Sequence, residues 1–167
     1  MKLSRLLRHR WLDETDARRA LGDAALARLE ARVRDSERHH SGEIRLCVEA
    51  GLPLSYLWHD RGARDRAVAM FGKLGVWDTE ANNGVLIYLL LAERRIEIVA
   101  DRGVARLVPQ QHWHQAVAGM ASAFAEGRFE EGLAQAVDAV DALLATHFAV
   151  ASHQANPNEL SDRVDLR

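Results

Sequence analysis

The sequence has little cysteine, no long apolar run and little net charge, and each shortage excludes a class of protein. Cys47 is the only cysteine in 167 residues, so the chain forms no internal disulfide and a reducing compartment is its natural location. The longest strongly apolar run without charge, residues 84–92, is far shorter than the ~20 residues that a helix needs to cross a bilayer. The formal net charge of -2 argues against a dedicated nucleic-acid binder. We therefore expect a cytoplasmic protein without a transmembrane segment and without a nucleic-acid partner.

The composition that remains fits one globular domain. Hydrophobic residues make up 48% of the chain and charged residues 28%, which is enough to build one core and a charged surface. We expect the core domain to span residues 13–149. Residues 150–167 contain few large apolar side chains, and this composition predicts a loosely ordered C-terminal tail.

Residues 1–12 form a basic arm with helical spacing. Leucines and Trp11 fall on one side of a helical wheel, and Lys2, Arg5, Arg8 and Arg10 fall on the other. Such an amphipathic helix either packs on its own domain or lies against a protein partner or an anionic membrane, and the last case would place the protein peripherally at the inner membrane surface. The sequence leaves these alternatives open.

Hydrophobic periodicity predicts the main helices and strands of the domain. Apolar residues recur at helical spacing in residues 13–40, 60–74, 109–126 and 130–148. Residues 43–50 and 96–100 alternate between apolar and polar side chains, whereas 85–91 is apolar on both faces, as in a central strand covered by helices on both sides. The first two strands and their crossover helix form a βαβ unit with parallel strands, and the third strand returns antiparallel after a tight turn. The pattern thus predicts an α/β fold with a small mixed sheet.

This topology brings acidic and amide side chains to one edge of the sheet. The start of the first strand, the loop before the second and the end of the third all lie at that edge. The side chains concerned are Glu43, Asp78, Glu80, Asn82, Asn83 and Asp101. Neighbouring carboxylates repel one another unless a cation, arginines or protons compensate them, and Ca²⁺ and Mg²⁺ prefer such oxygen ligands. The sequence therefore predicts a divalent cation, Ca or Mg, as a partner bound at this edge.

A purely structural role for the same residues remains open. In this alternative Asp78 caps a turn, the two asparagines supply turn conformations, and Arg45, Arg102 or Arg106 neutralises the carboxylates. Solvated acidic loops of this kind are common, so spacing alone does not choose between the two explanations.

Five short motifs follow one another in a characteristic order. They are Gly-Glu-Ile at 42–44, Phe71 with Leu74, Asn-Asn-Gly-Val-Leu-Ile at 82–87, Glu-Ile-Val-Ala-Asp-Arg-Gly at 97–103, and Gly-Arg-Phe-Glu-Glu-Gly at 127–132. Together they cover residues 41–148 and resemble the TPM domain family, and the chain is similar to its short soluble bacterial branch. The resemblance implies a three-layer αβα sandwich with helices on both faces of a small mixed sheet.

The resemblance also implies two functions. A plant thylakoid member is described as a weak acid phosphatase, whereas bacterial members are described as calcium-binding or uncharacterised. The family's proposed metal and phosphatase site maps to the acidic loop and to the turn at 101–103. For phosphatase chemistry, a metal would hold phosphate oxygens, Asp101 or Glu43 would orient water or attack, and Arg102 would stabilise developing charge.

The catalytic parts of a phosphatase are incomplete in this sequence, because it has no P-loop and no clear nucleophile motif. We therefore expect a calcium-binding interaction module. The alternatives are a weak metal-dependent acid phosphatase acting on phosphomonoesters and a metal-free structural or membrane-peripheral interaction protein.

Three further residues carry expectations. Trp58 and Trp77 flank the predicted helix at 60–74, and we expect them to close the ends of the core, with an exposed apolar patch for a partner as the alternative. Cys47 has no candidate histidine base beside it in the sequence, so we expect a small packed residue and not a nucleophile.

Overall fold

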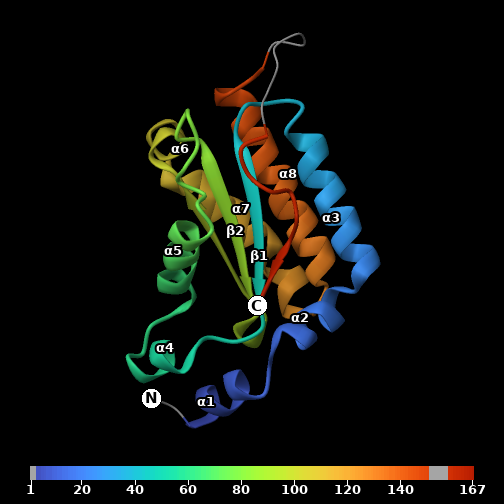
Figure 1. The fold of residues 1–167 in the computed structure, drawn as a ribbon, viewed down its shortest axis with the longest axis vertical. Helices are drawn as coiled ribbons and strands as arrows, with labels where there is room; N and C mark the ends of the chain where they lie inside the picture. The colour runs from blue at the N-terminus through green and yellow to red at the C-terminus, as the bar shows by residue number, and fades with distance from the viewer. Residues whose placement is uncertain (1–2, 151–157) are drawn as a thin grey trace.

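A four-stranded mixed sheet forms the middle layer of the protein, as the computed structural model shows for residues 3–150 and 158–167 (Figure 1). The strands are β1 Glu43–Glu49, β2 Gly84–Leu90, β3 Arg95–Ala100 and β4 Asp165–Leu166, in the spatial order β3-β2-β1-β4. β1 pairs in parallel with both β2 and β4, and β3 runs antiparallel to β2. The predicted βαβ unit and the antiparallel return strand are therefore confirmed.

Helices cover both faces of this sheet. The helices are α1 Leu3–Arg10, α2 Glu14–Leu21, α3 Asp23–Ser36, α4 Leu54–Trp58, α5 Ala63–Lys73, α6 Arg102–Leu107, α7 Gln110–Ala125 and α8 Phe129–His147, with a 3-10 turn at Leu91–Glu93. Figure 1 shows α3 and α8 side by side on one side of the sheet and α5 on the other. The three-layer αβα sandwich is thus confirmed.

The alternation of side chains along the strands divides the core in two. Ile87 and Leu89 of β2 face one side and pack with apolar residues of α3, α7 and α8. Leu86 and Leu90 face the other side and pack with α5 and the end of α4. Every residue of β2 is buried, which explains why its sequence is apolar without alternation.

The predicted helix at 13–40 is two helices. Gly22 separates α2 from α3 and has a φ of 78°, a left-handed conformation that glycine adopts without the cost borne by other residues. Asp13 caps α2, because its side chain accepts hydrogen bonds from the backbone N–H groups of Thr15 and Asp16. Apolar spacing continues across the break, so periodicity alone did not show it.

The C-terminal strap, which we define as residues 158–167, lies along the free edge of β1. The N–H of Arg167 donates to the carbonyl of Val48 (3.0 Å), and the N–H of Ala50 donates to the carbonyl of Arg167 (2.7 Å). Composition predicts a loosely ordered tail over 150–167, whereas the strap is held by these backbone hydrogen bonds and by polar side chains of the domain. The rest of that prediction, residues 151–157, lies outside the described residues.

The N-terminal arm folds as α1 and packs across the opposite end of the sheet from α6 (Figure 1). Leu6 packs against the α5 side of the core, and His9 is buried. Gly51 approaches this helix so closely that a β-carbon at its position would lie 2.7 Å from the carbonyl oxygen of His9. Among the described helices, none has both the length and the apolar character that a membrane crossing requires.

Candidate functional site

Backbone hydrogen bonds bring three distant segments together at the α6 end of the sheet. The N–H of Asp101 donates to the carbonyl of Gly84 (2.9 Å), and the N–H of Gly103 donates to the carbonyl of Asn82 (3.0 Å). On the other side of β2, the N–H of Glu43 donates to the carbonyl of Asn83 (3.4 Å). The segments that the predicted topology places at one edge of the sheet therefore do meet there.

Two buried side chains at this edge each have an oxygen without a hydrogen-bond partner. Asp101 is 6% exposed; its Oδ1 accepts the N–H of Arg102 (2.6 Å), whereas its Oδ2 has no partner among the described residues. Asn83 is also buried and donates through Nδ2 to the carbonyl of Ser41 (2.8 Å), but its Oδ1 is unpaired within the described part of the chain. A buried polar atom left unpaired costs about 1–3 kcal/mol. Both oxygens therefore lack a compensating partner among the described residues.

The loop between α5 and β2 presents the remaining predicted ligands to solvent. Asp78, Glu80 and Asn82 are all exposed. Asn82 has a φ of 51°, so the expected turn conformation is present at this position. The described residues include no group of three or more His, Cys, Asp or Glu side chains placed to hold a metal ion. The predicted ligands are thus at one edge without being gathered into a ready-made metal centre.

Glu43 lies in the half of the edge that the C-terminal strap covers. It is buried, and its two carboxylate oxygens accept the N–H groups of Glu159 (3.2 Å) and Leu160 (3.1 Å). Burial raises the pKa of the Glu43 carboxyl, and the two N–H donors oppose that rise. The carboxylate of Glu159 in turn accepts the N–H of Glu80 (2.9 Å), which ties the strap to the acidic loop.

Glu37 joins this half of the edge from the end of α3. Its Oε1 accepts the N–H of Ile44 (3.2 Å). Burial and the nearby charge of Glu43 raise the pKa of the Glu37 carboxyl to about 8. The sequence does not predict Glu37 or Glu159 as part of this edge, because no local pattern connects the end of α3 or the strap with the start of β1.

The predicted arginines do not neutralise the acidic edge directly. Arg45 donates to the carbonyl of Ser161 and lies 3.9 Å from the carboxylate of Asp165, so it holds the strap. Arg102 and Arg106 are exposed, and their side chains form no hydrogen bond or ion pair with another described residue. The phosphatase role of Arg102, and with it the catalytic role of Asp101 or Glu43, stays a prediction.

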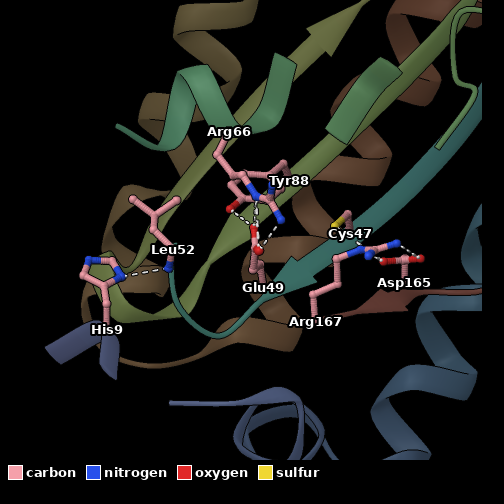
Figure 2. Close-up of polar contacts among 8 residues, drawn as sticks. All are labelled: His9, Cys47, Glu49, Leu52, Arg66, Tyr88, Asp165 and Arg167. Atoms are coloured by element: carbon pink, nitrogen blue, oxygen red, sulfur yellow. Dashed lines mark hydrogen bonds and ion pairs between the residues drawn. The ribbon is translucent and has the colours of Figure 1, made fainter. Parts of the chain in front are cut away.

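The opposite end of the sheet carries a paired network instead (Figure 2). Glu49 at the end of β1 is buried, and the guanidinium of Arg66 binds its carboxylate through Nη2 (2.7 Å) and Nε (2.8 Å). The hydroxyl of Tyr88 donates to the same carboxylate (2.6 Å). The guanidinium of Arg66 also lies over the ring of Tyr56, 5.3 Å from its centroid. This arrangement compensates the buried charge of Glu49 with one guanidinium and one hydroxyl donor.

Two neighbours of this network are also accounted for. His9 accepts the N–H of Leu52 at Nδ1 (3.0 Å) and contacts Glu93 through Nε2 (3.2 Å), so its Nδ1 is unprotonated (Figure 2). Cys47 is fully buried, and burial raises the pKa of its thiol to about 12. At neutral pH the thiol is protonated, as expected of a packed residue and not of a nucleophile.

A hollow of about 440 Å³ lies between α3 and α8. Its walls carry charges that are already matched, since Arg28 pairs with Glu130 (2.6 Å) and Arg32 with Asp138 (2.5 Å). These four lining side chains are therefore already paired with one another.

Known proteins share this architecture. The chain resembles the BA42 protein of the psychrophilic bacterium Bizionia argentinensis, whose NMR structure is 26% identical over 87% of this chain and 94% of that one, with a TM-score of 0.75. The solution NMR structure of the N-terminal domain of a P. gingivalis protein is 22% identical, covers 81% of this chain and 90% of its own, and gives a TM-score of 0.63. A search of the curated proteins finds no match. The model of the TPM domain matches residues 15–143, which include all of β1, β2, β3 and the acidic edge, and the chain therefore belongs to the TPM domain family.

Proposed function

We propose that this protein is a divalent-cation-binding interaction module whose site is centred on Asp101. The observation that carries the proposal is the buried Oδ2 of Asp101, which has no hydrogen-bond partner among the described residues. A carboxylate oxygen kept from water and left unpaired is costly, and a hard cation compensates both its charge and its lost hydrogen bond.

The other donors fit a weak calcium or magnesium site. The unpaired Oδ1 of Asn83 and the exposed side chains of Asp78, Glu80 and Asn82 supply further oxygens within the same edge. Ca²⁺ accepts six to eight such ligands in a flexible geometry, including amide and backbone oxygens and water. Because the described residues contain no preformed group of three carboxylates, we propose that the exposed loop moves toward Asp101 as the ion binds. Ordering that loop costs free energy and keeps the affinity low.

Glu43 is excluded from the proposed ligand set. Both of its oxygens already accept backbone N–H groups of the strap. We assign it the role of holding Glu159, which contacts the acidic loop at Glu80. A cation that moves the acidic loop would therefore also move the strap through Glu159. Such a change in surface shape on cation binding suits an interaction module better than an enzyme.

Thermal unfolding of the purified protein in EDTA, Ca²⁺ or Mg²⁺ tests the proposal. An ion at about 100 times its dissociation constant stabilises the fold by about 2.7 kcal/mol, which raises the midpoint by several degrees in a domain of this size. Asp101→Asn should abolish the rise and Asp78→Ala should reduce it. Asp23→Asn, which changes an exposed carboxylate on α3, is the matched control and should retain the rise.

Two results would contradict the proposal: no ion shifts the midpoint of the wild type, or the shift persists in Asp101→Asn. Hydrolysis of p-nitrophenyl phosphate by the same samples tests the phosphatase alternative. We expect no saturable rate that depends on Asp101.

A further inference from the structure

The α1 end of the molecule carries tryptophan and leucine side chains that the core does not use. Leu7 and Trp11 are 51% and 80% exposed, and Leu54 and Trp58 are 52% and 76% exposed. We call these four residues the outer stripe. The expectation that Trp58 and Trp77 close the ends of the core is therefore wrong, because Trp77 is also 54% exposed.

The positions of the outer stripe follow from helix geometry. Leu54 and Trp58 are four residues apart in α4, so they occupy one side of that helix. Leu7 lies in α1, and Trp11 directly follows the last residue of that helix. The inward sides of the same helices are occupied by other residues: Leu6 for α1 and Leu57 for α4 pack in the core. Since α1 packs against α4, the two outward pairs lie at the same end of the molecule (Figure 1).

Positively charged side chains neighbour Leu7 and Trp11 along the chain. Arg8 and Arg10 are exposed and form no hydrogen bond or ion pair with another described residue. Arg5, by contrast, fixes the base of α1 by binding Glu93 (2.9 Å) and Asp60 (3.1 Å). The helix is thus anchored by one arginine while two others remain free for an external anion.

Together these features select one kind of partner. Exposed tryptophans with leucines suit the interface between lipid headgroups and acyl chains, where an amphipathic ring is partly buried and partly wet. Free arginines suit anionic headgroups, and each adds roughly 1 kcal/mol near such a surface. A protein partner would call for a matching acidic groove, whereas a bilayer requires only this mixture of apolar and cationic groups on a protruding end.

We propose that the α1 end docks peripherally on the surface of an anionic membrane, with the outer stripe inserted among the headgroups and Arg8 and Arg10 bound to lipid phosphates. The acidic edge at the other end of the sheet then faces away from the membrane. This inference stands independently of the proposed cation site, because it uses none of the same residues.

Co-sedimentation of the full chain with vesicles tests the proposal. One set of vesicles contains phosphatidylcholine alone and the other contains phosphatidylglycerol as well. We expect binding to the second set, weakening as salt is raised, together with a blue shift of tryptophan emission. The Trp11→Ala and Trp58→Ala double variant should bind at least about tenfold more weakly. The Arg8→Glu and Arg10→Glu double variant should lose the preference for phosphatidylglycerol.

Trp77→Ala is the matched control. Trp77 is also an exposed tryptophan, at 54%, but it lies in the loop at the opposite end of the sheet, so its loss should leave vesicle binding unchanged. Circular dichroism and thermal unfolding show that each variant is folded before it is compared.

Three outcomes would overturn the proposal. The first is that the wild type binds neither set of vesicles. The second is that Trp77→Ala weakens binding as much as the double tryptophan variant. The third is a concentration-dependent dimer, lost in the double tryptophan variant, without any vesicle binding, which would assign the outer stripe to a second copy of this chain.

Discussion

The two ends of the sheet handle buried negative charge in opposite ways. At the α1 end, the carboxylate of Glu49 binds Arg66, and that of Glu93 binds Arg5. At the α6 end, the buried carboxylates of Glu43 and Asp101 accept backbone N–H groups, and among the described residues neither binds an arginine and Asp101 keeps an unpaired oxygen. A paired charge gives a rigid scaffold, whereas charge left without a cation needs a proton or an external ion. From this difference we infer that the α1 end stabilises the fold and that the α6 end binds a ligand.

Breaking the paired end should have the largest effect. In Arg66→Met the stem volume is kept, but Glu49 is left as a buried charge whose one remaining side-chain partner within the described part of the chain is Tyr88. We expect the free energy of unfolding to fall by about 3–5 kcal/mol, measured by urea denaturation. Combining Arg66→Met with Glu49→Gln removes the stranded charge and should restore part of the loss. A single variant as stable as the wild type would show that the network is not a structural requirement.

The contribution of His9, at the same end of the sheet, should make the stability of the protein depend on pH. Burial lowers the pKa of His9, so the unfolded chain takes up a proton at higher pH than the folded one. The stabilisation is complete above the unfolded pKa, about 6.5, and is lost as pH falls below it. His9→Ala should cost about 1–3 kcal/mol at pH 7, because the N–H of Leu52 loses its acceptor.

His9→Asn is the control for that pH dependence. The amide oxygen of asparagine replaces Nδ1 as an acceptor and does not titrate. His40 is also buried with a lowered pKa and contributes a fall of the same sign, so the variant should flatten the pH profile only in part. Thermal midpoints between pH 7.5 and pH 5 measure the difference. Identical profiles in wild type and His9→Asn would contradict the assignment.

Glu37, at the acidic end, should make stability depend on pH in the opposite direction. Its folded pKa of about 8 lies above the unfolded value, so its contribution to stability is complete below pH ~4.5 and is lost as pH rises toward 8. Glu37→Gln keeps the acceptor for the N–H of Ile44 but never ionises. We expect it to raise stability at pH 8 by about 1 kcal/mol, a modest value because solvent screens a half-buried site.

The measurement is the thermal midpoint of Glu37→Gln and wild type at pH 5 and pH 8. The two proteins should differ less at pH 5 than at pH 8, because less of the Glu37 contribution has been lost at pH 5. A variant less stable than the wild type at pH 8 would show that the ionised carboxylate is needed, and would weaken the contrast between the two ends.

Hydrophobic periodicity in the sequence predicted the three main strands of the sheet. The strands β1, β2 and β3 and their directions follow from alternation, from the uninterrupted apolar run of β2 and from the tight turn after it. The sequence pattern did not predict the helix break at Gly22, because the apolar period continues through it. β4 was missed because two residues carry no periodicity, and their pairing with β1 depends on a contact that spans most of the chain.

The sequence predicted those parts of the candidate site that follow from the order and direction of the strands. Topology placed the turn at 101–103 beside the acidic loop, and the hydrogen bond from the N–H of Gly103 to the carbonyl of Asn82 shows that the two segments are in contact. The role of Glu43 as an anchor for Glu159 and Leu160 depends on the strap, whose position no local sequence signal reveals. The binding of a cation itself remains a prediction.

The pairing of β4 with β1 also has a consequence for synthesis. Cys47 and Asp165, which face each other across this pair, are 118 positions apart in the chain. The edge of β1 therefore stays uncovered while the ribosome translates nearly the whole domain, and an uncovered parallel edge is a template for pairing with other chains. Contacts over such a separation also form late in folding. Nascent copies of this protein should thus be most prone to aggregate just before residues 158–167 emerge.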